Sequence, residues 1–337
     1  MSGMNPAISP SGKRQMEQRM KGQKKQPVEQ PLKQPLKQPL KQPAERQMEQ
    51  SPAPVILEPI RKEYIWGTED WMFSWLHKGM EKYPLLIKII RAREALSVQV
   101  HPDNEFAREA EQKSGKTEMW YVLDCEPGAY LYYGLKHKIS EDEFRKRIKN
   151  QTILEVCRKV PVKRGDVFYI PAGLLHAIGG GITVAEIQQS SDVTYRVYDY
   201  NRENAQHEKR ELHIDKAALV AGFMPPLAGH HPMGPRIQKN GYSRTLLVQC
   251  PYFVVQLYEI EKNLEGDTLQ GFRSLLILEG EGVLTGGGKS LRLGAGMSIC
   301  LPEGMEFYRL EGKMKLLVST GEESREASEP GRTEQKE

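Results

Sequence analysis

The sequence lacks the features that mark membrane and secreted proteins. No run in its 337 residues approaches eighteen consecutive apolar residues, which excludes a membrane-spanning helix. The first 50 residues contain no apolar stretch that could form the core of a signal peptide. Only four cysteines are present; they lie far apart and form no CxxC pair. This argues against a thiolate metal cluster and predicts a reduced, cytoplasmic protein.

Positive charge is concentrated at the start of the chain. The whole sequence has a net charge of +4, but residues 1–54 carry +6, so the rest carries −2. Such a body lacks the basic surface typical of nucleic-acid binding, and no nucleic-acid partner is expected. Residues 1–54 are rich in Gln, Pro and Lys and have few residues that could form a core. They are predicted to be disordered, as are the polar residues 321–337.

Short β-type runs bounded by glycine and proline predominate between these ends. The runs are Leu85–Ile90, Leu96–Val100, Met119–Leu123, Val167–Ile170, Ile182–Ile187 and Thr194–Tyr198. Residues 140–160 differ, because Ser140 and Glu143 form a capping box and apolar residues up to Cys157 follow at helical spacing. A short helix is also expected after Asp215. Sparse helices among many strands predict an all-β sandwich or barrel.

Two segments share one spacing of turn residues, in which Gly165, Pro171, Gly173 and His176 match Gly296, Pro302, Gly304 and Phe307. A glycine turn, a strand and a Pro-x-Gly turn that presents the next residue inward are typical of a barrel hairpin. The pattern therefore predicts two related barrels. The first, with His176, is expected to hold a ligand, whereas the second, with Phe307, is expected to be filled.

Side chains of metal-binding types recur in the first of these barrels. Alternation along one strand puts Gln99 and His101 on the same face, and Glu118 leads the next strand. His176 follows the Pro-x-Gly turn. Two imidazoles, a carboxylate and an amide oxygen are a suitable ligand set for a divalent cation, with room for an exchangeable ligand.

Charged residues also interrupt otherwise apolar strands. The aliphatic neighbours of Lys88 favour a lysine that points into a polar cavity over one at a solvent-facing edge. Lys116 is expected at the rim of the same cavity. Glu186 lies within another apolar strand, followed by Arg196. These two residues form either a structural ion pair or a site in which Arg196 is a fixed cation near a developing oxyanion.

The strings SVQVHPDN, GKTEMWYVLDC, GDVFYIPAGLLHAIGGG and TYRVYDY resemble the bacterial class I mannose-6-phosphate isomerases of the cupin superfamily. The resemblance runs roughly from Val55 to Leu317. It implies an all-β fold of two cupin (jelly-roll) barrels with a small helical insertion near 140–160. It also implies a cytoplasmic zinc enzyme, with one Zn²⁺ per chain, that interconverts mannose 6-phosphate and fructose 6-phosphate. No membrane partner is expected, and the oligomeric state, monomer or dimer, stays open.

Carried over residue by residue, the resemblance implies four zinc ligands, namely Gln99, His101, Glu118 and His176. Arg196 matches the family's catalytic arginine, and Lys88, Lys116 and Glu186 match active-site positions. Residues 55–228 would form the catalytic domain and residues 229–320 a second barrel without the metal histidine. The chain departs from the family pattern in residues 68–83, a segment shorter than the usual helical lid region.

The implied reaction moves a proton between C1 and C2 of the sugar through an enediol(ate). A metal can polarise the substrate oxygens, and lysines at the rim suit a phosphate group. Glu186, a metal-bound water and a lysine all remain candidates for the general base. Two other functions stay open: an iron cupin dioxygenase, because two histidines and a carboxylate also bind Fe(II), and a non-catalytic phosphosugar-binding module.

Overall fold

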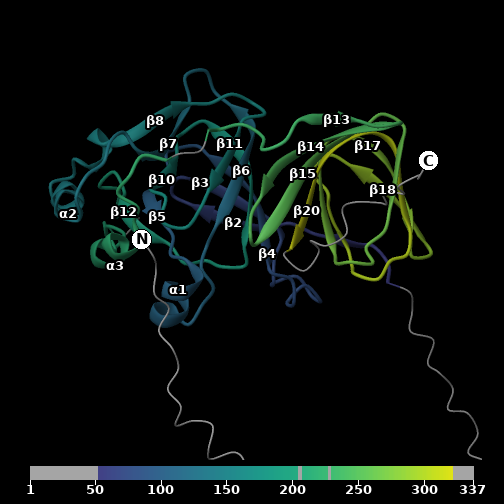
Figure 1. The fold of residues 1–337 in the computed structure, drawn as a ribbon, viewed down its shortest axis with the longest axis horizontal. Coiled ribbons are helices and arrows are strands. Elements are labelled where there is room, and N and C mark those ends of the chain that lie inside the picture. The colour runs from purple at the N-terminus through teal and green to yellow at the C-terminus, as the bar shows by residue number, and fades with distance from the viewer. Residues whose placement is uncertain (1–51, 204–206, 227–228, 322–337) are drawn as a thin grey trace, which may run out of the picture. The chain divides into compact units, whose positions relative to one another are not determined.

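The structure is a computed structural model that describes residues 52–203, 207–226 and 229–321. The described chain is mostly strand, arranged in three sheets with three short α-helices, which confirms the predicted all-β class (Figure 1). None of the helices in these ranges has the length and apolar character needed to cross a membrane. Residues 1–51 and 322–337 of the predicted disordered ends lie outside the described residues, so their disorder stays a prediction.

Two antiparallel sheets from the first part of the chain pack against each other. The six-stranded sheet has the order β2 (Ile60–Tyr64), β3 (Gly67–Phe73), β4 (Leu85–Ala92), β11 (Ile182–Gln189), β6 (Glu118–Cys125), β9 (Val167–Ile170). The five-stranded sheet has the order β12 (Tyr195–Tyr198), β5 (Val98–Val100), β10 (His176–Ile178), β7 (Tyr130–Leu135), β8 (Cys157–Pro161). Ile90 and Val184 of the first sheet pack with Leu131 and Ile178 of the second in one buried cluster. The inward faces of the two sheets therefore pack into a shared core.

The helices are α1 (Asn104–Glu111), α2 (Glu141–Lys149) and α3 (Ile214–Val220), with a short 3₁₀ turn at Ile153–Glu155. The predicted capping box is present, because Ser140 Oγ accepts from the Glu143 N–H over 3.1 Å. The predicted helical insertion near 140–160 is present as α2 and the 3₁₀ turn, but it ends before Cys157. Gln151 adopts a left-handed conformation with φ 60°, and the chain then enters β8, where Cys157 pairs with Leu135. Helix α1 was not predicted.

A nine-stranded sheet is built from the second part of the chain. Its order is β1 (Val55–Leu57), β19 (Ser298–Leu301), β17 (Arg273–Gly286), β20 (Tyr308–Gly321), β15 (Phe253–Ile260), β14 (Tyr242–Gln249), β13 (Arg236–Gln238), with β16 (Asn263–Gly266) on β20 and β18 (Lys289–Gly294) on β17. Strand β1 thus joins this sheet, although the sequence prediction counted it with the first domain. Gly321 is the last residue of β20 and pairs with Phe253, so its prediction as part of the disordered C-terminal segment was wrong.

The predicted repeat is present in the backbone but not in the side chains. Its four glycines, Gly165, Gly173, Gly296 and Gly304, all have φ between 85° and 90°, a conformation that glycine adopts without steric cost. His176 is fully buried, as expected. Phe307 is 49% exposed, so its predicted place inside the second barrel was wrong. Tyr308 and Met305 pack into that interior instead, together with apolar side chains from the surrounding strands.

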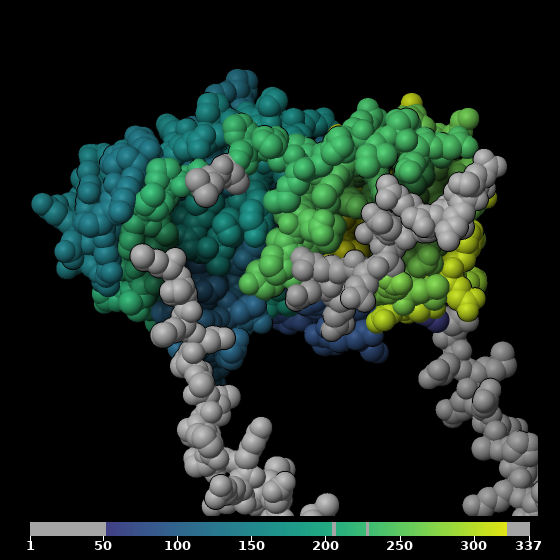
Figure 2. Space-filling view, in the orientation of Figure 1, coloured from purple at the N-terminus to yellow at the C-terminus, as the bar shows by residue number. Residues whose placement is uncertain are grey.

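One apolar cluster joins the first part of the chain to the second within one compact unit of the described residues. Phe73 of β3 stacks on Phe272, with ring centroids 5.7 Å apart, and Leu85 and Leu276 belong to the same cluster. Figure 2 shows the surface of this unit. Between Phe73 and Leu85 the chain forms turns and no helix, in line with the short segment seen in the sequence.

Candidate active site

The predicted metal ligands come together between the two sheets of the first part of the chain. Gln99 on β5 and His176 on β10 are direct partners across the five-stranded sheet, and His101 follows β5. Glu118 begins β6 in the six-stranded sheet. One donor atom from each of His101, Glu118 and His176 lies within 4.8 Å of the others, and all three side chains are buried. The sequence spacing therefore identified residues that the fold brings to one point.

Backbone carbonyls orient both imidazoles. His101 Nδ1 lies 2.9 Å from Val193 O, and His176 Nδ1 lies 2.7 Å from Leu174 O. A carbonyl only accepts, so each Nδ1 carries the proton and each Nε2 keeps a free lone pair. These Nε2 atoms face Glu118, at 3.6 Å from Oε2 for His101 and 3.4 Å from Oε1 for His176. Both rings thus present a metal-binding atom to the carboxylate.

Three of the metal-facing atoms lack a hydrogen-bond partner in the described part of the chain. Among the described residues, His101 Nε2 and both oxygens of Glu118 are buried without a hydrogen bond. Burial lowers the pKa of His176 to about 4 and that of His101 well below its usual value, so both rings are neutral. Neutral imidazole nitrogens and carboxylate oxygens that face one another all present lone pairs, an arrangement that a divalent cation would satisfy. The residues therefore fit a zinc ion.

Gln99, the fourth predicted ligand, lies beside this group with its amide nitrogen toward it. Gln99 Nε2 is 3.3 Å from His176 Nε2. The two ends of an amide have almost the same shape, so a 180° rotation would present Oε1 in the same place. The side chain thus lies within reach of the donor group, but the amide oxygen does not face it.

Next to Glu118 lies a series of buried, charged side chains in which lysines and carboxylates alternate. Lys116 Nζ is 3.0 Å from Glu118 Oε2, an ion-pair distance without hydrogen-bond geometry, and 3.9 Å from Glu186 Oε1. Lys88 Nζ is 2.8 Å from the same Glu186 oxygen. Lys88 is buried, so the alternative of a solvent-facing lysine was wrong. Lys116 is also buried rather than at a rim.

The electrostatics of these carboxyls differ according to their neighbours. Burial and the charge of Glu186 raise the pKa of Glu118, and the nearby lysines offset this only in part. Burial also opposes ionisation of Glu186, but Lys116, Lys88 and two hydrogen bonds outweigh it and lower its pKa. Glu186 is therefore a fixed negative charge between two ammonium groups.

Several residues of this cluster were missed from the sequence. Glu69 on β3 accepts from Trp71 Nε1 and lies 3.8 Å from Lys88 Nζ. Trp120 Nε1 donates to Glu186 Oε2 over 2.9 Å, and Gln188 Oε1 accepts from Lys88. Gln188 could have been found, because it lies two residues after Glu186 on one strand and so shares its face.

Arg196 lies on the same sheet as two predicted ligands but makes no ion pair with Glu186. It is the direct partner of Gln99 across β12 and β5, so the two side chains share a face. Arg196 Nη1 donates to Glu211 O over 2.9 Å, and its Nε is buried without a partner among the described residues. Burial and the charge of Arg210 lower its pKa. The predicted alternative, a Glu186–Arg196 ion pair, was wrong.

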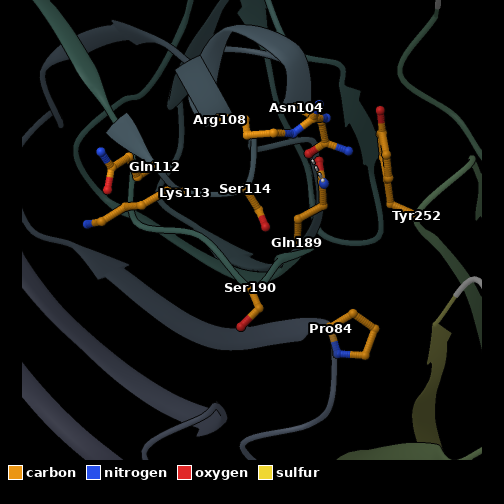
Figure 3. Close-up of a pocket in the computed structure, with 9 residues that line it drawn as sticks. All are labelled: Pro84, Asn104, Arg108, Gln112, Lys113, Ser114, Gln189, Ser190 and Tyr252. Atoms are coloured by element: carbon orange, nitrogen blue, oxygen red, sulfur yellow. Dashed lines mark hydrogen bonds between the residues drawn. The ribbon is translucent and has the colours of Figure 1, made fainter. Parts of the chain in front are cut away.

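A separate cavity of about 730 Å³ lies beside the segment that carries Lys116 (Figure 3). It is lined by Pro84, Asn104, Arg108, Gln112, Lys113, Ser114, Gln189, Ser190 and Tyr252. None of the predicted site residues lines it. Asn104 and Gln189 point toward each other and are joined by a hydrogen bond.

Comparison with known proteins agrees with this arrangement. The profile of the phosphomannose isomerase type I catalytic domain matches residues 68–127, and that of the mannose-6-phosphate isomerase cupin domain matches residues 243–321. Mannose-6-phosphate isomerase of Streptococcus mutans is 39% identical over 241 residues, which cover 72% of this chain and 75% of that protein. Mannose-6-phosphate isomerase ManA of Bacillus subtilis is 37% identical over 256 residues, 76% of this chain and 80% of that protein.

Solved structures show the same fold. The crystal structure of the mannose 6-phosphate isomerase from Bacillus subtilis matches with a TM-score of 0.73 at 32% identity, covering 80% of this chain and 99% of that chain. A zinc-bound mannose 6-phosphate isomerase shares the fold with a TM-score of 0.60 at 13% identity, covering 80% and 99% of the two chains. The chain therefore belongs to the type I mannose-6-phosphate isomerase family, as the resemblance of its motifs predicted.

Proposed function

We propose that this protein is an aldose–ketose isomerase that interconverts mannose 6-phosphate and fructose 6-phosphate. The observation that carries the proposal is the buried group of His101, Glu118 and His176, next to a chain of lysines and carboxylates, in a member of this family. A metal donor set alone would suit many reactions. Cationic side chains beside it match a substrate that carries a phosphate and develops an oxyanion.

We propose that His101, Glu118, His176 and Gln99, the last through its amide oxygen, hold one Zn²⁺ per chain. The zinc would act as a Lewis acid that polarises the substrate oxygens at C1 and C2. The pre-oriented Nε2 atoms and the unpartnered Glu118 oxygens support this ligand set. Rotation of the Gln99 amide is the one rearrangement it requires.

The remaining charged residues act on the sugar directly or through one another. Lys116 is the cation nearest to the ligand group. Its Nζ would donate a hydrogen bond to the substrate oxygen on which charge develops. Glu186 accepts from Lys88 and Trp120 with its two oxygens, so it orients the ammonium groups rather than taking a proton from the sugar. Arg196, on the face of Gln99, adds a second fixed positive charge.

The domain division is part of the proposal. Residues 55–228 form the catalytic domain, apart from β1, and residues 229–320 form a second, filled barrel without a metal histidine. Its apolar interior supports a structural role. The protein acts in the cytoplasm on a small phosphosugar, which accords with four cysteines that lie far apart in the sequence.

A coupled assay of the purified protein on mannose 6-phosphate, before and after chelation, tests the proposal. We expect turnover that chelation abolishes and Zn²⁺ restores. Oxygen consumption with bound iron would instead favour the dioxygenase. Saturable binding of the sugar without turnover would favour a binding module, and either result would overturn the isomerase.

A further inference from the structure

We propose that Gln188 and Gln189, the last two residues of β11, are positioning residues for Lys88 and Lys116, respectively. The inference rests on the proposed function, in which both lysines belong to the site. Successive side chains of a strand point to opposite faces, so neighbouring amides can serve two different places. Gln188 faces the buried charged chain, and Gln189 faces the segment that carries Lys116.

Lys116 lies on irregular backbone just before β6, where its own N–H donates to Pro102 O over 3.0 Å but no strand pairing continues. Gln189 supplies the missing contacts at the next residue. Its backbone N–H donates to Thr117 O over 3.1 Å, and its side-chain Oε1 accepts from the Thr117 N–H over 2.8 Å. One residue therefore holds both backbone polar groups of Thr117, the residue between Lys116 and Glu118.

Asn104 determines which way the Gln189 amide points. Gln189 Nε2 donates to Asn104 Oδ1 over 3.0 Å, as Figure 3 shows, and the same oxygen accepts from the Gly115 N–H over 2.9 Å. With its nitrogen committed to this acceptor, Gln189 turns its oxygen to Thr117. A side chain at residue 115 would break the arrangement, because a Cβ there would lie 2.3 Å from the carbonyl carbon of Asp103.

The Gln188 amide is fixed by the same principle. Its Nε2 donates to two backbone carbonyls, Gln189 O at 2.8 Å and Ser191 O at 2.5 Å. Its Oε1 is therefore left to accept from Lys88 Nζ at 2.9 Å. Gln188 is fully buried, so no water competes for this contact.

The two amides together set where the lysines stand around Glu186. Glu186 Oε1 lies 2.8 Å from Lys88 Nζ and 3.9 Å from Lys116 Nζ. A shift of about 1 Å in a reacting geometry can cost roughly 100-fold in rate. Loosening either amide should therefore lower kcat while the zinc ligands stay in place.

Gln189→Met tests this, because it keeps the length of the side chain and removes both hydrogen bonds of the amide. We expect kcat to fall about 10- to 100-fold in zinc-loaded, folded enzyme, with a smaller change in KM. Gln112→Met is the matched control. Gln112 lines the same cavity and makes no side-chain hydrogen bond within the described ranges, so its substitution should leave kcat unchanged.

The decisive measurement is a double-mutant cycle between Gln189→Met and Lys116→Met, with enzyme concentrations high enough to detect residual turnover. If Gln189 acts through Lys116, its substitution has little further effect once Lys116 is lost. If Gln189→Met does not fold, Asn104→Ala replaces it; this variant removes the acceptor that orients the Gln189 amide, together with the acceptor of the Gly115 N–H. Gln188→Met and Lys88→Met form the corresponding cycle for the other lysine.

Additive losses in these cycles, with zinc content and fold intact, would overturn the inference and leave the proposed function standing. An unchanged kcat in Gln189→Met would do the same. A wild-type protein without isomerase activity would overturn both.

Discussion

Lys88 and Glu186 are direct partners on neighbouring strands β4 and β11, with Lys88 Nζ 2.8 Å from Glu186 Oε1 and both side chains almost fully buried. This pair links the core of the six-stranded sheet to the candidate active site, because the same carboxylate oxygen also faces Lys116. Removing one member of a buried ion pair leaves the other charge unpaired. Stability and site geometry therefore depend on the same contact.

Glu186→Gln should destabilise the protein and reduce turnover together. Lys88 Nζ would keep its hydrogen bond to Gln188 Oε1 but would lose its ion pair with Glu186. The remaining carboxylate near it, that of Glu69, is 3.8 Å away. We expect the free energy of unfolding to fall by about 3–5 kcal/mol, measured by urea denaturation. Glu279→Gln is the control, because its pair with Arg164 is exposed and should contribute about 1 kcal/mol or less. Equal effects of the two substitutions would contradict the prediction.

His101→Ala should reduce the amount of zinc that co-purifies with the chain, because one of the oriented Nε2 donors is lost. His137→Ala should keep full zinc content, because His137 is exposed and remote from the donor group in the sequence. Elemental analysis of the two variants at equal protein concentration gives the answer. Full zinc content in His101→Ala would rule out this histidine as a ligand.

Strand β1 makes the position of an N-terminal truncation important. Leu57 is buried in the cluster that joins the first and second parts of the chain, and β1 pairs with β19. Pro52 and Ala53 also lie against Gly287. Removal of residues 1–57 should therefore lower the melting temperature well below that of a chain lacking only residues 1–51. Loss of the Leu57 contacts alone should lower the free energy of unfolding by about 2–5 kcal/mol. Equal melting temperatures would show that β1 contributes no stability.

Much of the fold could be predicted because its signals are local. The capping box at Ser140, the alternation around Gln99 and the Pro-x-Gly turn before His176 each involve only a few neighbouring residues. Helix α1 escaped prediction because it buries only Ala107, and its cap, Asp103 Oδ1 accepting from the Phe106 N–H, lacks the reciprocal Glu of a capping box. At eight residues, the helix is also shorter than the window of about 11 to 18 residues over which helical periodicity is recognised.

Contacts between distant segments could not be predicted. The pairing of Lys88 with Glu186 spans 98 residues and depends on β4 lying beside β11. Phe307 follows the same turn as His176, yet the chain beyond it directs Tyr308 rather than Phe307 into the interior. Matching turns fix the backbone at those residues, whereas packing of the whole sheet decides which side chain is buried.

Asp199 predicts a pH dependence of stability. Burial opposes its ionisation, but hydrogen bonds from Arg210 and Arg202 outweigh this and hold its pKa below the usual value. A depressed folded-state pKa gives stability that is present above the unfolded pKa of about 3.9 and is lost as the pH falls through the folded value. The difference in melting temperature between wild type and Asp199→Asn should therefore be large at pH 7 and shrink below about pH 4.

Glu109→Gln is the control for this titration, because Glu109 is exposed and has no ion pair within the described ranges. It should follow the wild type at both pH values. A difference between wild type and Asp199→Asn that stays constant from pH 7 to pH 3 would show that the arginine contacts do not depend on the charge of Asp199.

The contacts of Arg196 favour a catalytic role for this residue over a structural one. Its guanidinium donates to a single backbone carbonyl, that of Glu211, and has no carboxylate partner in the part of the chain that the structure describes. Glu186, the partner that a structural role would have required, is fully engaged by Lys88 and Trp120. Little folding energy therefore depends on the charge of Arg196.

Arg196→Ala should accordingly lower kcat sharply while zinc content and melting temperature change little. Negative charge appears on the C1 and C2 oxygens only on the way to the enediolate, so a fixed cation near them stabilises the transition state more than the ground state. Loss of one such preorganised donor costs about 10²–10³ in kcat. Arg196→Lys should recover part of this, because it restores the charge without the planar fork. Turnover, zinc content and melting temperature are measured on the same sample; a stable, zinc-loaded and fully active Arg196→Ala enzyme would exclude the role.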